Sequence, residues 1–448
     1  MYIEELHLQN FRGFKELKLQ FPRNLAVIIG VNGSGKSSIL DAIAIFLSIL
    51  SIYINQPQLK RRRKNSTLSD QTGLTEDDIY INAQESENLI QVIIEPHQKI
   101  SWSIRKSKDN STIKQVEAEE LLSHIKNTLE ALEQNPSLSL PALVYYKTNR
   151  MVVTPSSALR WDLLTTAIRQ GNQINAYEGA FSNQVNDFKD FFGWFKAEED
   201  YENEIRLREN TNYRNKNLEI VRIAITKFLN NFPKTHFDNL HVVRVSTDQK
   251  LRKLRVNPTF TIEKNGQPFK LEKLSDGEKM LLMVVTDLAR RLAILNPSVE
   301  EPAKVLEGKG IVLIDEVDLH LHPQWQRIVV PALTNTFPNC QFIVTTHSPQ
   351  VLSQVHKENV FILENYELIE ETPYTFGKDS NSILYELMGV TERPLEVQQQ
   401  LDECFQLIDN NKIKEAKIKL QNLTSLLGED DPELVRAYTL INFFNRKE

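Results

Sequence analysis

The chain has 448 residues, which exceeds the size of one average hydrophobic core and predicts about two or three domains. Its hydrophobic content of 41% and charged content of 25% are typical of a globular protein. The net charge of -6 excludes a uniformly basic nucleic-acid binder but leaves room for local basic patches. Cys340 and Cys404 have neither disulfide-framework nor metal-ligand spacing, so both are expected to be core residues of a reduced protein.

The N-terminal stretch carries charges within a strand pattern, which excludes a signal peptide. We find no run of about eighteen apolar residues that could span a bilayer. These features predict a soluble cytoplasmic protein without membrane contact.

The first strands form a hairpin. Residues 2–8 and 17–21 alternate between apolar and polar, with a turn at Arg12-Gly13 between them. This hairpin leads into the next apolar strand, and residues 10–12 are expected to be exposed beside the site that follows.

The stretch Gly30 to Ser37, GVNGSGKS, fits the phosphate-loop pattern GxxxxGK[ST] between an apolar strand at 25–29 and a helix at 38–50. Its glycines let backbone N–H groups turn toward a polyphosphate, and the helix N-terminus adds partial positive charge. Lys36 is expected to reach the β- and γ-phosphates and Ser37 to bind Mg²⁺. The residues predicted to contact the nucleotide phosphates here are Asn32, Gly33, Ser34, Gly35, Lys36, Ser37 and Ser38.

Five adjacent cations occupy residues 60–64. Their mutual repulsion favours a solvated loop, although neutralising nucleic-acid phosphates is a second interpretation. Paired strands at 89–95 and 100–105, a helix at 117–132 and a strand at 140–146 follow.

From residue 157 to about 232 the pattern is mainly helical. An aromatic group in this stretch favours the buried face of a helical insertion over a base-stacking platform. Its members are Phe188, Phe191, Phe192, Trp194 and Phe195.

Strands return at 241–245 and 254–262, and the pair Asn265-Gly266 suits a hairpin turn. The sequence LSDGEK follows, and Ser275 with Glu278 three residues later predicts a capping box that opens a helix reaching Leu295.

The apolar strand 311–314 ends in Asp315 and Glu316. In doubly wound folds, residues that bind metal ions or activate water lie at the C-terminal ends of the parallel strands. Asp315 can hold the water shell of Mg²⁺, and Glu316 can accept a proton from the attacking water. The next strand, 341–344, leads to His347, which is placed to sense the γ-phosphate.

His320 and His322 stand two residues apart, a spacing that does not suit a helical zinc site. After residue 370 the pattern is helical, at 383–387, 397–408, 413–427 and 434–444. This tail lacks the carboxylate clusters of a nuclease module, which favours a packing or partner-docking bundle.

The four motifs GVNGSGKS, LSDGEK, IVLIDE and TTHSP occur in one order, and together they resemble the ABC-type ATPase heads of the RecF, SMC and Rad50 group. The resemblance implies an α/β fold, a P-loop ATPase head with a mixed sheet flanked by helices, and the cofactors ATP and Mg²⁺. In this group the arginine that Arg12 matches contacts a nucleotide phosphate. The signature residues, here Ser275 and Gly277, reach the γ-phosphate on another subunit, which implies a head-to-tail homodimer or a higher homo-oligomer.

No sustained heptads lie between Lys36 and Ser275, so the chain is a compact relative rather than a long coiled-coil protein. Its outline resembles the ATPase component of Septu-type and retron-associated antiphage systems, which implies a separate HNH-type nuclease partner. DNA or retron nucleic acid is a further candidate partner. Asp276 replaces the first glycine of the transporter-type signature, which implies slow turnover. The strand end at 146–150 is the candidate region for the group's Mg²⁺-contacting glutamine.

We therefore expect an N-terminal lobe at 1–150, a helical insertion at 151–235, a C-terminal lobe at 236–375 and a helical tail at 376–448. The first functional hypothesis is an ATPase whose nucleotide-driven dimerisation regulates a partner nuclease in antiphage defence. The alternative is a RecF-like DNA-repair ATPase that binds duplex DNA and recruits other proteins. A transporter subunit is disfavoured by the insertion and by the sequence after Glu316.

Overall fold

A computed structural model of the chain describes residues 1–59, 74–94, 98–108, 115–148, 173–181, 189–246, 256–390 and 393–445. These residues form two compact units, Met1–Lys378 and Asp379–Glu448. The basic run at 60–64, the aromatic Phe188 and positions 149–150 lie outside the described residues. The predicted division of the larger unit into two lobes and an insertion stays a prediction.

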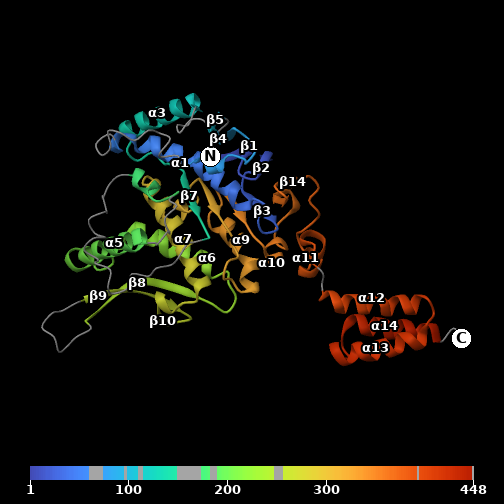
Figure 1. Ribbon diagram of the computed structural model, residues 1–448. Coiled ribbons are helices and arrows are strands. Elements are labelled where there is room, and N and C mark those ends of the chain that lie inside the picture. The colour runs from blue at the N-terminus through green and yellow to red at the C-terminus, as the bar shows by residue number, and fades with distance from the viewer. Residues whose placement is uncertain are drawn as a thin grey trace. The chain divides into compact units, whose positions relative to one another are not determined.

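A six-stranded mixed sheet forms the centre of the larger unit. Its strands are β3 (Leu25–Gly30), β7 (Ala142–Tyr146), β11 (Gly310–Ile314), β12 (Cys340–Thr345), β13 (Val360–Glu364) and β14 (Glu367–Ile369). Their order is β14-β13-β3-β12-β11-β7, with β14 antiparallel to β13 and the other neighbours parallel (Figure 1). The strands β7, β11 and β12 are buried at every position, as expected for parallel strands covered on both faces.

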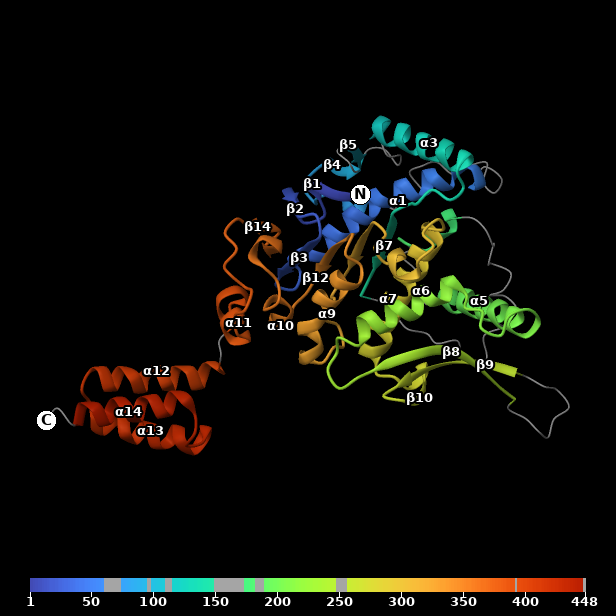
Figure 2. The ribbon, with the colours of Figure 1, turned by 180° about the vertical axis from the view of Figure 1, so that it is seen from behind.

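Helices cover both faces of this sheet, and two neighbouring tyrosines show which helix lies on which face. Successive side chains of a strand point to opposite faces. On β7, Tyr145 hydrogen-bonds Asp41 on α1 (Lys36–Leu59), whereas the Tyr146 hydroxyl donates to Asp287 on α7 (Asp276–Leu295) over 2.9 Å. Figure 2 shows α1 on one side of the sheet and α7 on the other, near α6 (Lys216–Leu229) and α9 (Pro323–Thr336). The predicted mixed sheet flanked by helices is confirmed.

A second, antiparallel sheet has the order β2-β1-β4-β5-β6. Its strands are β1 (Tyr2–Phe11), β2 (Phe14–Gln20), β4 (Glu85–Ile94), β5 (Gln98–Ser107) and β6 (Gln115–Glu117), with η1 (Glu76–Asp78) before β4 and α3 (Glu119–Gln134) packed on β5. The predicted N-terminal hairpin is therefore present. Phe11 was expected to be exposed, but it is fully buried, because its position in the hairpin faces the core of this sheet.

The described part of the predicted helical insertion consists of η2 (Gln173–Tyr177), α5 (Lys189–Arg208) and α6. Four of its predicted aromatics have been placed, and all are buried: Phe191, Phe192, Trp194 and Phe195. The rings of Phe192 and Phe260 lie 4.6 Å apart, so α5 packs on a three-stranded sheet. That sheet is β8 (Phe237–Ser246), β9 (Val256–Lys264) and β10 (Gln267–Lys270), and Asn265 (φ 52°) with Gly266 (φ 75°) forms its predicted hairpin turn.

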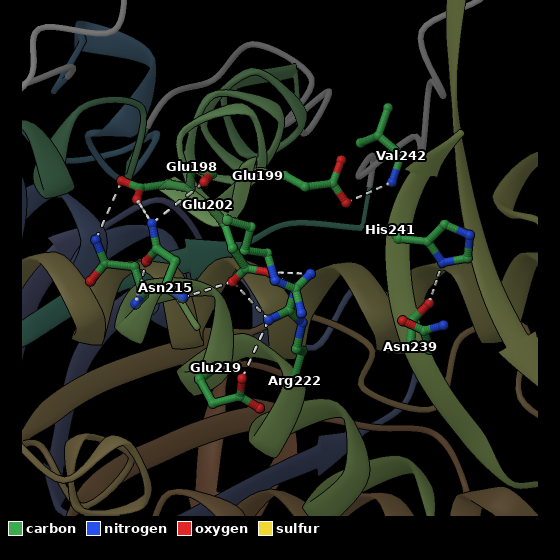
Figure 3. A network of polar contacts seen from close by, with 11 residues as sticks. Glu198, Glu199, Glu202, Asn215, Glu219, Arg222, Asn239, His241 and Val242 are labelled. Atoms are coloured by element: carbon green, nitrogen blue, oxygen red, sulfur yellow. Dashed lines mark hydrogen bonds and ion pairs between the residues drawn. The ribbon is translucent and has the colours of Figure 1, made fainter. Parts of the chain in front are cut away.

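A buried polar network joins these elements (Figure 3). Glu202 on α5 is 1% exposed and accepts hydrogen bonds from Arg222 at 3.1 Å and from the backbone N–H of Asn215 at 2.7 Å. Glu199 accepts from the backbone N–H of Val242 on β8 at 2.9 Å. Buried charges need such partners, so part of the acidic run after the aromatics fixes α5 against α6 and β8.

Short elements complete the larger unit: η3 (Leu271–Lys273), α8 (Pro302–Val305), α10 (Pro349–Leu352) and η4 (Lys357–Asn359). Cys340 on β12 is buried and free, as predicted, and burial raises the pKa of its thiol to about 12. His322 caps α9 by accepting from the backbone N–H of Gln324.

One described helix segment, Lys36–Ile54 of α1, is long and apolar enough to cross a membrane by length and composition, and 56% of its most apolar stretch is buried. Asp41, Ser48 and Ser51 interrupt the segment, so it is not the uninterrupted run of about eighteen apolar residues that the sequence was expected to lack. The segment belongs to the helix that packs on β3, β7, β11 and β12 and carries the polar contacts of Asp41, which is the arrangement of a core helix.

The smaller unit contains α11 (Ser380–Met388), α12 (Leu395–Asp409), α13 (Ile413–Leu427) and α14 (Pro432–Asn445), close to the four predicted helices. Cys404, Leu420 and Ile441 lie in the apolar core that α12, α13 and α14 share. Gly428 ends α13 with φ 89°, and Asp431 accepts hydrogen bonds from the first N–H groups of α14. The predicted helical tail is confirmed.

Candidate phosphate-binding and catalytic site

The phosphate loop joins β3 to α1; all three of its glycines have backbone angles that favour glycine, and Gly30 and Gly35 also lack space for a side chain. Gly30, Gly33 and Gly35 have φ values of 151°, 82° and 103°. A Cβ atom on Gly30 would lie 2.3 Å from the carbonyl oxygen of Leu363, and one on Gly35 would lie 2.5 Å from the ring of Phe14. Larger residues would therefore displace the loop, as the sequence pattern predicts.

Lys36 is folded into the loop. Its Nζ donates to the carbonyl oxygens of Gly30 at 2.9 Å and Val31 at 3.0 Å, and the residue is 7% exposed. Burial lowers the pKa of Lys36, against the opposing charges of Asp315 and Glu316. A phosphate oxygen would be a stronger acceptor for this amine than the two neutral carbonyls. Ser34 Oγ is also buried and has no hydrogen-bond partner among the described residues.

The first turn of α1 and the ends of β11 and β12 bring hydroxyl and carboxylate oxygens together. Ser37 Oγ donates to Asp315 Oδ1 at 3.2 Å, although 278 positions separate them in the sequence. Thr345 Oγ1 donates to the same oxygen at 2.6 Å and accepts from the backbone N–H of Glu316 at 2.7 Å. A serine hydroxyl beside a carboxylate, with a phosphate position adjacent, is the oxygen chemistry that Mg²⁺ prefers. The residues present therefore fit this ion.

Glu316 and His347 lie at the same edge of the sheet. Glu316 has φ 49°, an uncommon backbone conformation for a residue other than glycine. Both side chains are half-buried. Burial, followed by the charge of Lys36, lowers the pKa of His347, so the imidazole is neutral at pH 7 and can accept or donate a hydrogen bond.

Arg12 sits at the turn between β1 and β2, beside the first turns of α1. Its guanidinium donates to Asp78 at 2.8 Å, to Asp41 at 2.7 Å and to Ser38 Oγ at 3.4 Å. Burial alone would lower the pKa of Arg12, but the two carboxylates raise it, so it stays charged. Asp41 also pairs with Lys147 at 3.4 Å. A phosphate contact by Arg12 remains a proposal, since its described partners are carboxylates and a hydroxyl.

The signature segment begins α7 as predicted. Ser275 Oγ accepts from the backbone N–H of Glu278 at 3.3 Å, and Glu278 accepts from the Ser275 N–H at 2.9 Å, which is a complete capping box. A Cβ on Gly277 would lie 2.5 Å from the carbonyl oxygen of His320. The start of α7 therefore abuts the segment that follows Glu316. Asp276 points outward, with its side chain 77% exposed.

Four residues near the site were not predicted from the sequence: Asp41, Asp78, Lys147 and Thr345. Lys147 follows β7, and because Ile314 pairs with Tyr146 in register, Lys147 lies level with Asp315. A register between β7 and β11 is not encoded locally. Thr345 lies in the TTHSP motif, and Lys147 falls in the candidate region at 146–150, but neither residue was assigned a role from the sequence.

A phosphate loop, a carboxylate–hydroxyl pair and a second carboxylate at neighbouring strand ends define the class of an ABC-type P-loop ATPase head. The profile of the RecF/RecN/SMC N-terminal domain family matches residues 2–367, and the chain belongs to this family. The resemblance inferred from the four motifs is thereby confirmed.

Two relatives and one solved structure are similar to this chain. Retron Vc95 probable ATPase of Vibrio cholerae serotype O1 biovar El Tor is 32% identical over 434 residues, covering 88% of this chain and 80% of the relative. Septu protein PtuA of Bacillus thuringiensis is 23% identical over 439 residues, covering 98% and 92%. An SMC head bound to the C-winged helix domain of ScpA is 17% identical, with a TM-score of 0.42, covering 83% of this chain and 98% of that one.

Proposed function

We propose that the chain binds ATP with Mg²⁺ and hydrolyses it, and that nucleotide-driven dimerisation regulates a partner nuclease in antiphage defence. The observation that supports ATP chemistry best is the convergence of Lys36, Ser37, Asp315 and Glu316 at one edge of the sheet. These groups supply a cation for phosphate, oxygen ligands for a metal and a carboxylate for water, which are the parts that phosphoryl transfer to water needs.

In this proposal the phosphate loop, residues 30–37, holds the polyphosphate with its N–H groups, and Lys36 moves from its carbonyl partners to the phosphates. Ser37 and Asp315 hold Mg²⁺, which when bound neutralises charge on the phosphates. Glu316 accepts a proton from the attacking water, and His347 donates a hydrogen bond to the γ-phosphate. Arg12, beside Ser38, exchanges a carboxylate partner for phosphate.

Dimerisation completes the site. Ser275 and Gly277 at the N-terminus of α7 contact the γ-phosphate held by a second copy in a head-to-tail homodimer, where the positive end of the helix favours an anion. Gly277 packs on the segment after Glu316, and this contact supports coupling between the signature segment and the catalytic edge of the same subunit. Because Asp276 adds an exposed negative charge at this N-terminus, turnover is slow.

The relatives support a role in defence, which we place in the cytoplasm as part of this proposal. Relatives named as a retron ATPase and as Septu PtuA align with most of this chain. A separate HNH-type nuclease is the proposed partner, together with DNA or retron nucleic acid. The tail carries exposed apolar side chains that suit docking, among them Ile418 at 63% and Leu426 at 62% exposure.

The decisive variant is Glu316→Gln, with Glu370→Gln as its control because Glu370 is exposed and belongs to the same unit. We expect ATP turnover to fall at least about a hundredfold while ATP binding persists and a dimer accumulates by light scattering. Parental turnover in Glu316→Gln would refute the assignment of the base. A monomer at saturating ATP would refute the composite site.

The partner is tested by purifying the chain with the products of its neighbouring genes and weighing the complex by native mass spectrometry. An ATP-dependent complex with a nuclease subunit is expected. Binding of duplex DNA without any such subunit would favour the RecF-like repair function instead.

A further inference from the structure

Tyr366 has an unusual position at the tip of the β13–β14 hairpin, next to the phosphate loop. Asn365 and Tyr366 have φ values of 49° and 65°, so both turn residues are left-handed. Asparagine adopts this conformation at little cost, whereas an aromatic residue does so uncommonly. Tyr366 therefore has a backbone conformation that glycine or asparagine adopts at lower cost.

The Tyr366 ring packs closely against two glycines. A Cβ on Gly13, in the β1–β2 turn, would lie 2.1 Å from the ring, and one on Gly35 in the phosphate loop would lie 2.9 Å from it. The ring also meets Phe14 edge to face, with centroids 5.4 Å apart and an interplanar angle of 88°. Tyr366 is nevertheless only half-buried, so part of it faces solvent beside the loop.

The order of the strands determines which residues lie on each side of the phosphate loop. On one side of β3 lie β12 and β11, which carry His347, Asp315 and Glu316. Ser37, the last residue of the phosphate loop, donates to Asp315 Oδ1 at 3.2 Å on this side, so the terminal phosphates of the proposed ATP belong there. On the other side of β3 lie β13 and β14, where Leu363 is paired with Gly30 and the turn follows directly.

In ATP the base is joined through the ribose to the α-phosphate, which is the end of the polyphosphate opposite the γ-phosphate. We propose that Tyr366 forms the aromatic wall of the nucleobase subsite, against which a planar purine packs. This inference rests on the proposed ATP binding. Arg12, one residue before Gly13 and 3.4 Å from Ser38 Oγ, lies beside the same end of the site.

An aromatic contact of this kind binds any base by its π-face, and its loss weakens binding of a base by about 1–3 kcal/mol, which corresponds to about 5- to 150-fold in Kd. It contributes nothing to binding of inorganic tripolyphosphate, which has the phosphates but no base. The ratio of the two affinities therefore isolates the subsite from the phosphate loop.

The test compares the full-length chain with Tyr366→Asn and Tyr366→Phe by calorimetric titration with MgATP and with Mg-tripolyphosphate. Asparagine suits the left-handed turn, so this variant removes the ring while keeping the backbone. Tyr374→Ala is the matched control, because Tyr374 belongs to the same unit and is 69% exposed. We expect Tyr366→Asn to weaken ATP binding at least about fivefold, with tripolyphosphate binding unchanged within about twofold. Tyr366→Phe should match the parent.

Unchanged ATP affinity in Tyr366→Asn would overturn the proposal. Equal loss of ATP and tripolyphosphate affinity would also overturn it, because that result assigns Tyr366 to support of the phosphate loop. If the parent chain bound neither ligand, the proposed ATP binding itself would fail, so the two failures are distinguishable.

Discussion

Asp287→Asn is expected to destabilise the larger unit strongly. Asp287 on α7 accepts hydrogen bonds from Tyr146 at 2.9 Å, Arg290 at 2.8 Å and Arg291 at 2.7 Å, and its side chain is 7% exposed. Arg291 also donates to the carbonyl oxygen of Ala176, so the network joins α7 to β7 and to η2. Neutralising Asp287 leaves two buried guanidinium groups without their counter-charge.

Removing one partner of a buried ion pair costs about 3–5 kcal/mol. For the unit Met1–Lys378, an unfolding entropy of about 2.1 cal/mol/K per residue gives about 0.8 kcal/mol/K, so the melting temperature should fall by about 4–6 °C. The assay is thermal unfolding at pH 7.5, followed by circular dichroism and tryptophan fluorescence. The control is Glu130→Gln, which removes an exposed i,i+4 pair with Lys126 and should change stability by less than about 0.5 kcal/mol.

The difference in stability between the parent and Asp287→Asn should depend on pH in a defined way. Burial alone would raise the pKa of Asp287, but the charges of Arg291 and Arg290 lower it below 3.8. A lowered folded-state pKa means that the carboxylate stabilises the fold fully above the unfolded-state pKa, and that this contribution is lost as the pH falls through the folded-state value. The stability gap between parent and Asp287→Asn should therefore be constant from pH 7.5 to 5 and narrow below about pH 4. A melting temperature within about 1 °C of the parent at pH 7.5 would refute the reasoning.

Three further outcomes are expected. Lys36→Ala should weaken ATP binding about 10- to 150-fold by calorimetry, because charge-assisted hydrogen bonds to phosphate are lost; an unchanged Kd would contradict the role of Lys36. Gly277→Ala should cost about 1–3 kcal/mol in thermal unfolding through the clash with His320, whereas Asp276→Ala should cost less than about 0.5 kcal/mol; equal effects would contradict the close contact. Leu420→Ala should cost about 2–5 kcal/mol and speed hydrogen exchange in α12–α14 while leaving ATP affinity unchanged, and Leu426→Ala, at 62% exposure, should do neither.

Local patterns predicted the features that depend on neighbours in the sequence. The capping box of Ser275 and Glu278, the Asn265-Gly266 turn and the strand before Asp315 each follow from backbone preferences or periodicity within a few residues. The buried aromatics of α5 were predicted in the same way, because their spacing matches one helix face.

Contacts set by strand order were beyond this reasoning. Lys147 pairs with Asp41 because β7 lies next to β11 and above α1, and no local signal encodes that adjacency. The exposure of Phe11 was predicted wrongly for a related reason. The alternating pattern of the strand shows which side chains share a face of the sheet, but the burial of that face depends on β4 and η1, which come more than sixty residues later. The role proposed for Tyr366 likewise depends on the fold, which brings Gly13 and Gly35 beside its ring.

The side chain of Gln341 has a consequence for how the protein is made. On β12 it is 1% exposed, accepts from the Ile3 N–H at 2.7 Å across 338 positions, and donates to the carbonyl oxygens of Ile3 and Pro22. Both hydrogen-bonding partners of β3 in the sheet, β12 and β13, are likewise synthesised late. During translation, β3 therefore has both edges unpaired until β12 and β13 are made, and unpaired strand edges promote aggregation. A ribosome stalled before β12 would release a chain that carries an intact GVNGSGKS but has neither edge of its phosphate-loop strand paired.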